Sequence, residues 1–285
     1  MLLSDLLARG TELLAKAGIE SAAVDAQLLA AHVLGFSRGE LQSKLITDFE
    51  VDDVREIEEL FQKRSERIPL QHLTGVAYFR NLALQVGPGV FIPRPETEGV
   101  ADLAIQALRA VPGEPIAVDL CTGSGAIAIS LATEVPQAKV YAWELNPDSE
   151  KLLRQNIAAN GGAVELVMAD IASDHPLFIE LVGSVDVVIS NPPYIPTWAI
   201  PRDIEVQLHD PDLALYGGED GMDIMKVVSK RALQLLKPGG FLVVEHAESQ
   251  AKIVADLFQA DGWRQIRCHQ DLTARDRTTT AVKAF

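Results

Sequence analysis

From residue 115 to the end of the chain, short apolar segments alternate with segments of helical periodicity. The apolar segments are rich in Val, Ile and Leu, which is typical of strands buried on both faces of a parallel sheet. Helices between successive strands favour crossovers that cover both faces. We therefore predict an α/β fold with a seven-stranded, doubly wound, Rossmann-like sheet, with strands at residues 116–120, 140–144, 164–168, 185–190, 241–245, 264–268 and 278–282.

The fourth of these strands runs directly into Asn191-Pro192-Pro193-Tyr194. Pro192 and Pro193 have no backbone N–H to give to a ladder, so the strand must end here. Loops at the carboxyl ends of strands bind ligands in open α/β sheets. Asn191 adds a carbonyl acceptor and an NH2 donor, which suits a planar, neutral substrate nitrogen that carries hydrogens. The alternative is a purely structural turn, because Asn-Pro and Pro-Pro are common turn dipeptides.

A second candidate loop, Cys121-Thr122-Gly123-Ser124-Gly125, joins the first strand to the following helix. Its glycines let the backbone turn tightly and approach a ligand, and the helix N-terminus beyond favours a carboxylate or phosphate. Glu144 ends the next strand, where an acid can accept hydrogen bonds from both hydroxyls of a ribose. The spacing Gly-x-Gly-x-x-Ala also fits a dinucleotide fingerprint, so the loop predicts an adenosine cofactor without separating NAD from others.

Asp170 and Ile171 follow the third strand and are expected to meet the edge and the face of an adenine. For Asp170, a helix cap or a solvated loop acid is an equal alternative. Cys121 is interpreted as a small buried residue and not as a nucleophile, because no His lies near it in sequence. The spacing of Cys121 and Cys268 matches no metal motif, and we expect no metal site.

The chain before residue 93 has a different pattern, and we predict three parts: a helical domain at 1–72, a β-hairpin linker at 73–92 and a catalytic domain at 93–285. Glycines and prolines surround two short strand-like runs in the linker. The helical domain is expected to recognise a partner or to serve as a packing module. Its apolar residues recur at helical spacing over 2–14, 21–35 and 51–67.

The composition of the chain limits the classes of partner that it is expected to bind. The net charge of −15 does not provide the basic balance needed to grip a phosphate backbone, although a local basic patch stays open. The hydrophobic content of 48% permits a large core. No apolar run reaches the length of a membrane span, and the N-terminus lacks the basic segment of a signal peptide. We therefore expect a cytoplasmic protein without direct nucleic-acid or membrane binding. A monomer is the expected oligomeric state.

Together these motifs resemble the class I S-adenosylmethionine-dependent methyltransferases. Over nearly its full length the chain resembles the bacterial release factor glutamine methyltransferases, the PrmC/HemK family. One departure is Cys121, where the family usually has glycine, which bears on the local backbone geometry. The resemblance is carried by Leu73-Thr74-Gly75, Ile92-Pro93-Arg94-Pro95-Glu96-Thr97-Glu98, Asp119-Leu120-Cys121-Thr122-Gly123-Ser124-Gly125, Asn191-Pro192-Pro193-Tyr194 and Gly217-Gly218-Glu219-Asp220-Gly221.

The resemblance implies methyl transfer from S-adenosylmethionine, with S-adenosylhomocysteine as product, to the glutamine amide of the Gly-Gly-Gln motif in release factors, which modulates translation termination. It implies that Asn191 to Tyr194 bind the glutamine, with Asn191, Pro192 and Tyr194 as catalytic residues. The Asn191 side-chain oxygen and the Pro192 carbonyl would accept the two amide hydrogens, and Tyr194 would pack against the amide plane. It implies that the cofactor is bound by Cys121, Thr122, Gly123, Ser124, Gly125, Glu144, Asp170, Ile171 and Asn191.

Three alternatives stay open at this point. An adenine-N6 methyltransferase of DNA or RNA would share the chemistry of the Asn191 motif, but the acidic charge counts against it. A non-catalytic module that binds S-adenosylmethionine and a protein partner would not require an intact Asn191 motif. An NAD-dependent dehydrogenase would leave that motif unexplained.

Overall fold

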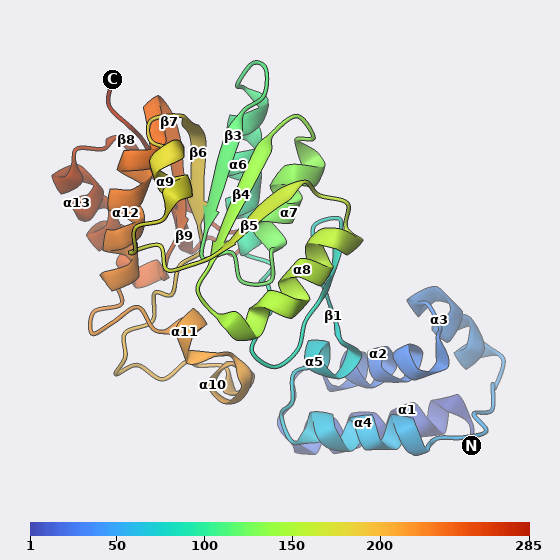
Figure 1. Ribbon diagram of the computed structural model, residues 1–285. Helices are drawn as coiled ribbons and strands as arrows, with labels where there is room; N and C mark the ends of the chain where they lie inside the picture. The colour runs from blue at the N-terminus through green and yellow to red at the C-terminus, as the bar shows by residue number, and fades with distance from the viewer. The chain divides into compact units, whose positions relative to one another are not determined.

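The computed structural model describes residues 1–285, which form two compact units (Figure 1). The first unit comprises Met1–Val76 together with Arg202–His209, and the second comprises Ala77–Pro201 together with Asp210–Phe285. None of the helices combines the length and the apolar character needed to cross a membrane.

The first unit is a helical bundle around a single apolar core. Leu6, Leu14, Leu29 and Ile57 are completely buried in that core. Gly10 lies against the ring of Phe61, where a Cβ would come within 2.4 Å of a ring carbon. The helices are α1 (Leu3–Lys16), α2 (Ala22–Leu34), α3 (Arg38–Ile46), α4 (Arg55–Ser65), α5 (Leu70–Thr74) and α10 (Ile204–His209).

Sequence periodicity predicts three of these six helices, α1, α2 and α4, and misses α3, α5 and α10. Helix α3 has a weak apolar stripe but is fixed by a capping box. The Ser37 side chain accepts from the Glu40 backbone N–H, and the Glu40 carboxylate accepts from the Ser37 N–H. Two such reciprocal bonds satisfy donors that a helix start leaves free. The short α5 ends at Gly75, whose φ of 73° lies in the left-handed region.

A buried network of ions holds α10 in the first unit. The Arg64 guanidinium contacts Asp25 at 2.8 Å and Glu205 at 2.8 Å, and Arg67 contacts Glu205 at 2.7 Å. Asp25 and Arg64 are almost fully buried. The sequence analysis placed residues 202–209 in the catalytic part of the chain, whereas in the structure this segment packs with the N-terminal helices.

The second unit begins with a two-stranded sheet of β1 (Val76–Phe79) and β2 (Leu82–Gln85), joined by two residues, so the predicted hairpin is confirmed. A seven-stranded sheet follows, also as predicted, with strand order β5-β4-β3-β6-β7-β9-β8. All its pairs are parallel except those of β9 with β7 and β8. The strands are β3 (Ile116–Leu120), β4 (Lys139–Glu144), β5 (Val164–Met168), β6 (Val185–Ser190), β7 (Leu236–Glu245), β8 (Arg264–Gln270) and β9 (Asp276–Val282).

Alternate residues of the central strands serve two separate cores, which makes the sheet doubly covered (Figure 1). Val187 and Ile189 of β6 pack with α6 (Thr97–Arg109) and α7 (Ala126–Glu134), while Val188 packs with α12 (Asp223–Leu235) and α13 (Ala251–Asp261). The remaining elements of the unit are α8 (Glu150–Ala159), α9 (Pro176–Glu180), α11 (Asp212–Leu215) and the 3-10 turns η1 (Pro147–Ser149) and η2 (Glu248–Gln250).

One strand is longer than the sequence predicts. The sequence analysis begins this strand at residue 241, but the segment Leu236–Gly240 is also part of β7, because Leu236 pairs with Val185 of β6. The ladder then shifts register before Val187 pairs with Phe241. Pairing with a neighbouring strand outweighs the turn preference of Pro238-Gly239-Gly240 at this position.

We expect Arg64→Met to destabilise the first unit strongly, because it leaves Asp25 buried without its cation. Removing one partner of a buried ion pair costs on the order of 3–5 kcal/mol. Arg55→Met is the matched control on the same helix, because Arg55 pairs with Asp53 at side-chain exposures of 84% and 59%. An exposed pair contributes about 1 kcal/mol or less. Urea unfolding followed by circular dichroism measures both losses, and equal losses would contradict the account.

Candidate functional site

The register of the parallel strands places the predicted site loops at one edge of the sheet. Leu120 at the end of β3 pairs with Trp143 of β4 and with Ser190 of β6. Ser190 in turn pairs with Val244 of β7. The residues that follow, Cys121, Glu144, Asn191 and Glu245, therefore emerge side by side at the carboxyl ends of four adjacent strands. The structure thus brings the glycine loop, Glu144 and the Asn191 motif together.

The glycine loop is ordered by a buried carboxylate at the end of β3. Asp119 accepts hydrogen bonds from the Thr122 hydroxyl at 2.6 Å and from the Ala128 N–H at 3.2 Å. Gly125 has a φ of 85°, and a Cβ there would lie 2.7 Å from a methyl of Leu153. Gly123 has a φ of 58° and open space where a Cβ would be, so its backbone can approach a ligand.

Glu144, the residue expected to bind a ribose, also holds the glycine loop. One oxygen of its carboxylate accepts from the Gly123 N–H at 2.7 Å and the other from the Asn146 N–H at 2.7 Å. Burial raises the pKa of Glu144, and these backbone hydrogen bonds oppose the rise. Each carboxylate oxygen retains a second lone pair for a ligand hydroxyl. The sequence analysis missed the anchoring of the loop by Glu144.

The donors and acceptors of this edge fit S-adenosylmethionine, which carries a positive charge, a ribose and a carboxylate. The second oxygen of Asp119 is buried without a hydrogen-bond partner, which favours a nearby cationic group. Burial raises the pKa of Asp119 to about 7. Helix α7 begins at Gly125 without a side-chain cap or an acidic residue in its first turn, which suits a carboxylate. Glu144 keeps acceptor capacity for the ribose hydroxyls.

Cys121 occupies a left-handed backbone conformation that favours glycine. Its φ is 65°, in the left-handed region that costs a residue with a Cβ about 1–2 kcal/mol. The side chain is half-buried, and burial raises the pKa of its thiol. A neutral thiol is a poor nucleophile. Cys121 therefore contributes backbone geometry and packing to the loop.

Asp170 and Ile171 lie next to Glu144 through the pairing of β4 with β5, and the Ala169 N–H donates to the Glu144 carbonyl at 2.9 Å. Ile171 is buried, and its side chain packs in the apolar core beneath this edge of the sheet. Asp170 is exposed, and its carboxylate accepts from the Ala172 N–H at 2.8 Å. In the structure Asp170 is an exposed loop acid, which is one of the alternatives that the sequence analysis held open, and no helix begins there.

Two hydrogen bonds link the Asn191 motif to α6 and β7, and a third joins α6 to β7. The Asn191 amide NH2 donates to the Thr97 hydroxyl at 3.3 Å, which donates to the Glu245 carboxylate at 2.7 Å. The Tyr194 hydroxyl donates to the other Glu245 oxygen at 3.3 Å. Burial raises the pKa of Tyr194, which keeps its phenol neutral. Pro192 and Pro193 are buried, so the loop has little freedom to move.

The glycine-rich stretch 217–221 packs against the back of this motif. A Cβ on Gly217 would lie 2.5 Å from the Pro193 carbonyl oxygen, and a Cβ on Gly221 would lie 2.3 Å from the Tyr194 carbonyl oxygen. The Gln250 amide donates to that same Tyr194 oxygen at 2.9 Å. Glycine is therefore required at both positions by close approach of the motif backbone.

Sequence reasoning missed Glu245 and singled out Thr97 only as part of the motif at residues 92–98 that carries the family resemblance. Glu245 could have been found by the rule that selected Glu144, because both are acids that end an apolar strand of a parallel sheet. Thr97 offered no comparable signal, since its role depends on a contact with Glu245 across 148 residues of sequence.

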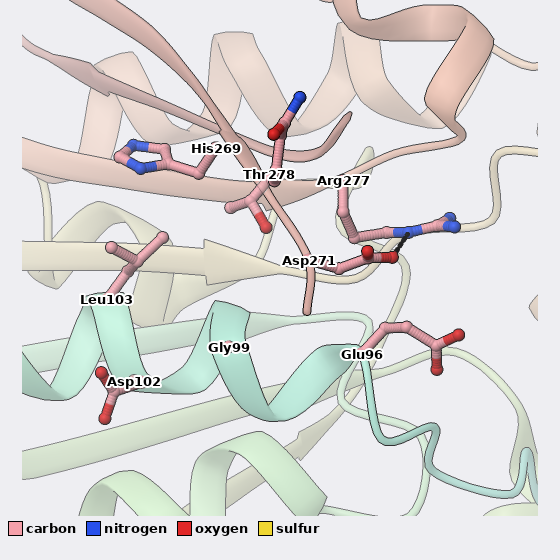
Figure 2. Close-up of a pocket in the computed structure, with 9 residues that line it drawn as sticks. Glu96, Gly99, Asp102, Leu103, His269, Asp271, Arg277 and Thr278 are labelled. Atoms are coloured by element: carbon pink, nitrogen blue, oxygen red, sulfur yellow. Dashed lines mark ion pairs between the residues drawn. The ribbon is translucent and has the colours of Figure 1, made fainter. Parts of the chain in front are cut away.

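A cavity of about 190 Å³ lies between the first turns of α6 and strands β8 and β9 (Figure 2). Its walls carry an ion pair between Asp271 and Arg277 at 3.7 Å. None of the predicted site residues lines it. No group of three or more His, Cys, Asp or Glu side chains is arranged to hold a metal ion. The candidate site is therefore the loop edge itself.

Comparison with known proteins gives matches over both units. The family model "PrmC N-terminal domain" matches residues 5–75, and "Methyltransferase small domain" matches residues 81–208. The release factor glutamine methyltransferase of Streptomyces coelicolor is 48% identical, over 98% of this chain and 97% of its own. That of Mycolicibacterium smegmatis is 43% identical, over 96% and 95%. A solved methyltransferase from Pyrococcus furiosus shares the fold, with a TM-score of 0.51 at 19% identity, over 72% and 90%.

We expect Gly125→Ala to destabilise the ligand-free protein more than Gly123→Ala. Both substitutions place a Cβ at positive φ, at about 1–2 kcal/mol each. Only the Gly125 substitution also drives a Cβ into Leu153, and such overpacking costs a further 1–3 kcal/mol or so. Chemical denaturation of the two variants measures the difference. If the Gly123 variant were equally or less stable than the Gly125 variant, the Leu153 side chain would have to move to accommodate the new Cβ.

Proposed function

The chain belongs to the release factor glutamine methyltransferase family, and we propose that it transfers a methyl group from S-adenosylmethionine to the side-chain amide nitrogen (N5) of the glutamine in the Gly-Gly-Gln motif of peptide-chain release factors. The family follows from relatives up to 48% identical over nearly the whole chain. The observation that carries the substrate chemistry is the Asn191 motif, an amide acceptor fixed at the carboxyl edge of the sheet. Methylation at this glutamine would modulate translation termination.

The chemical difficulty is the nucleophile, because the lone pair of an amide nitrogen is delocalised into its carbonyl. The Asn191 NH2 group donates a hydrogen bond to Thr97, so the side-chain oxygen of Asn191 can accept a hydrogen bond from a ligand. That oxygen and the Pro192 carbonyl would accept the two hydrogens of the glutamine NH2 and fix its plane. Fixed acceptor dipoles of this kind are worth more in a water-poor site than in water.

When bound, S-adenosylmethionine supplies a methyl group on a positively charged sulfur. Transfer of this methyl group to the amide nitrogen would break its bond to sulfur, with the electron pair going to sulfur, and would leave S-adenosylhomocysteine. One amide proton then leaves to water. No strong base is needed before transfer, because the nitrogen becomes acidic only as the new bond forms. The neutral Tyr194 phenol agrees with a packing role against the amide plane.

The cofactor residues carried over from the family are residues 121–125 with Glu144, Ile171 and Asn191. Gly123 offers close backbone approach, Glu144 offers free lone pairs for the ribose, and Ile171 offers a buried apolar face. Asp170 takes part only at the rim, since its carboxylate is exposed and caps Ala172.

For the remaining organisation we keep the assignment of residues 1–72 to release-factor recognition, 73–92 to a linker and 93–285 to catalysis. The N-terminal helices have an apolar core of their own, which supports a separate role. We also keep the expectation of a cytoplasmic monomer, and the candidate site itself draws its residues from a single chain. The net charge of −15 supports a protein substrate over the DNA or RNA of an adenine-N6 methyltransferase.

The function is tested by incubating an unmodified release factor with the protein and S-adenosylmethionine, followed by peptide mass spectrometry. We expect the Gly-Gly-Gln peptide to gain one methyl group on its glutamine. Asn191→Ala should slow this methylation by about 100-fold or more, as for other losses of a preorganised polar group at a reacting centre. Methylation of DNA, or of another residue with that glutamine untouched, would contradict the proposal.

Glu144→Ala should raise the dissociation constant of S-adenosylhomocysteine by a larger factor than it lowers kcat at saturation. Hydrogen bonds to a ribose are similar in the ground state and the transition state, so their loss appears in binding. Loosening of Gly123 adds to the same effect. Calorimetric titration and saturation kinetics measure the two factors, with Glu165→Ala on β5, an exposed site, as control. A large fall in kcat at unchanged affinity would refute the assignment.

A further inference from the structure

Glu245 is a fully buried carboxylate behind the Asn191 motif to which the proposed reaction assigns no task. It ends β7 and is 2% exposed. Both of its oxygens accept hydrogen bonds from hydroxyls, one from Thr97 at 2.7 Å and one from Tyr194 at 3.3 Å. A buried charged group is costly to keep in a protein, so one that contacts two elements of the site invites a functional explanation.

The hydrogen bonds that leave Glu245 have a fixed direction. An ionised carboxylate can only accept, so Thr97 must give its single hydroxyl proton to Glu245. The Thr97 oxygen is then an acceptor for its remaining neighbour, the Asn191 side chain, at 3.3 Å. Asn191 therefore turns its NH2 toward Thr97 and its oxygen away from it.

We propose that Glu245 is a positioning residue that sets, through the Thr97 hydroxyl, which end of the Asn191 amide meets the substrate. The proposal rests on the proposed function, in which the substrate presents an NH2 group and needs an acceptor opposite it. A flipped Asn191 would bring NH2 against NH2 and remove the acceptor from the reacting centre. An amide is nearly symmetric in shape, so only its hydrogen-bond partners can distinguish the two orientations.

The chain of hydrogen bonds from Asn191 through Thr97 to Glu245 is called the relay below. The charge state of Glu245 sets the direction in which these hydrogen bonds donate. Burial raises the pKa of Glu245 to about 7, while the Thr97 hydrogen bond, the charge of Arg277 on β9 and the Tyr194 hydrogen bond lower it, and Glu96 at the start of α6 raises it. The neighbouring His246 is engaged elsewhere, since its ring contacts the Ala247 carbonyl and the Thr279 hydroxyl. A protonated Glu245 carries an O–H that can donate to Thr97 and reverse the relay. Turnover should therefore rise with pH through about 7.

The effect on stability has the opposite sign. The folded pKa of about 7 lies above the ordinary value of 4.5, so between these two values Glu245 is ionised in the unfolded chain and protonated in the folded one. Its contribution to the stability of the folded state falls as the pH rises through this window. Above pH 7 the folded protein bears the cost of a buried charge. Glu245→Gln should therefore be at least as stable as the wild type at pH 8.

The first experiment measures kcat for release-factor methylation at saturating concentrations of both substrates. Glu245→Gln should lower kcat on the order of 100-fold, as for loss of a preorganised group, with the S-adenosylhomocysteine affinity and the melting temperature at pH 8 maintained. The rise of kcat through pH 7 should disappear in this variant. Glu248→Gln, an exposed acid three residues along the chain, is the control and should behave as wild type.

Thr97 supplies the second arm of the test. Thr97→Ser keeps the hydroxyl and should retain most of the turnover. Thr97→Val keeps the shape of the side chain without the hydroxyl, and its kcat should be lowered as much as that of Glu245→Gln. A merely structural role would lower the melting temperature of the valine variant and leave kcat per folded molecule unchanged. Wild-type turnover in Glu245→Gln or in Thr97→Val would overturn the proposal.

A readout without turnover separates this inference from the proposed function. Nitrogen-15 labelling of asparagine side chains, with Asn191→Ala to assign the resonance, follows the Asn191 NH2 group directly. We expect Glu245→Gln to shift that resonance and Glu248→Gln to leave it in place. An unshifted resonance would overturn the relay even if methylation is observed. If Glu245→Gln shifts the resonance but the wild-type protein leaves the release factor unmethylated, the positioning role of Glu245 is supported and the proposed function is contradicted.

Discussion

Parallel pairing of β3 with β4 and β6, and of β6 with β7, brings the carboxyl ends of four strands to one edge of the sheet. Every candidate site element depends on this register. It places the glycine loop between Glu144 and the Asn191 motif, and it places Glu245 next to that motif. A shift of one residue in any of these strands would turn its terminal side chain to the other face of the sheet.

Several buried acids gather at this same edge of the sheet. Stability alone does not require them, because burying a carboxylate costs free energy. Asp119 and Glu245 are fully buried with pKa values raised to about 7, and burial also raises the pKa of Glu144. Each is satisfied at least in part by N–H or O–H donors from the loops it orders. The hydrogen bonds that these buried acids accept hold the loops in place. The acids also provide a negative environment for a cationic methyl donor.

Periodicity and chain-breaking residues were sufficient to predict the seven strands, the hairpin, and the loops at 121–125 and 191–194, because these signals are local. The remaining features depend on contacts between residues far apart in the sequence. Thr97 meets Glu245 across 148 residues, and Glu205 reaches Arg67 across 138 residues, which moves 202–209 into the helical unit. The second role of Glu144, which is to hold the glycine loop, could not be predicted because its position at a strand end indicates ribose binding but gives no information about its hydrogen bond to the Gly123 backbone. The strained φ of Cys121 was indicated only by its departure from the glycine usual in the family.

The central claim is that the Asn191 motif presents acceptors to the NH2 group of a glutamine side chain. A crystal structure of the protein with S-adenosylhomocysteine and a peptide containing Gly-Gly-Gln tests it most directly. The account predicts that the glutamine nitrogen lies within hydrogen-bond distance of both the Asn191 side-chain oxygen and the Pro192 carbonyl, with the Asn191 NH2 still on Thr97. A glutamine bound elsewhere, or one whose carbonyl faces Asn191, would contradict it.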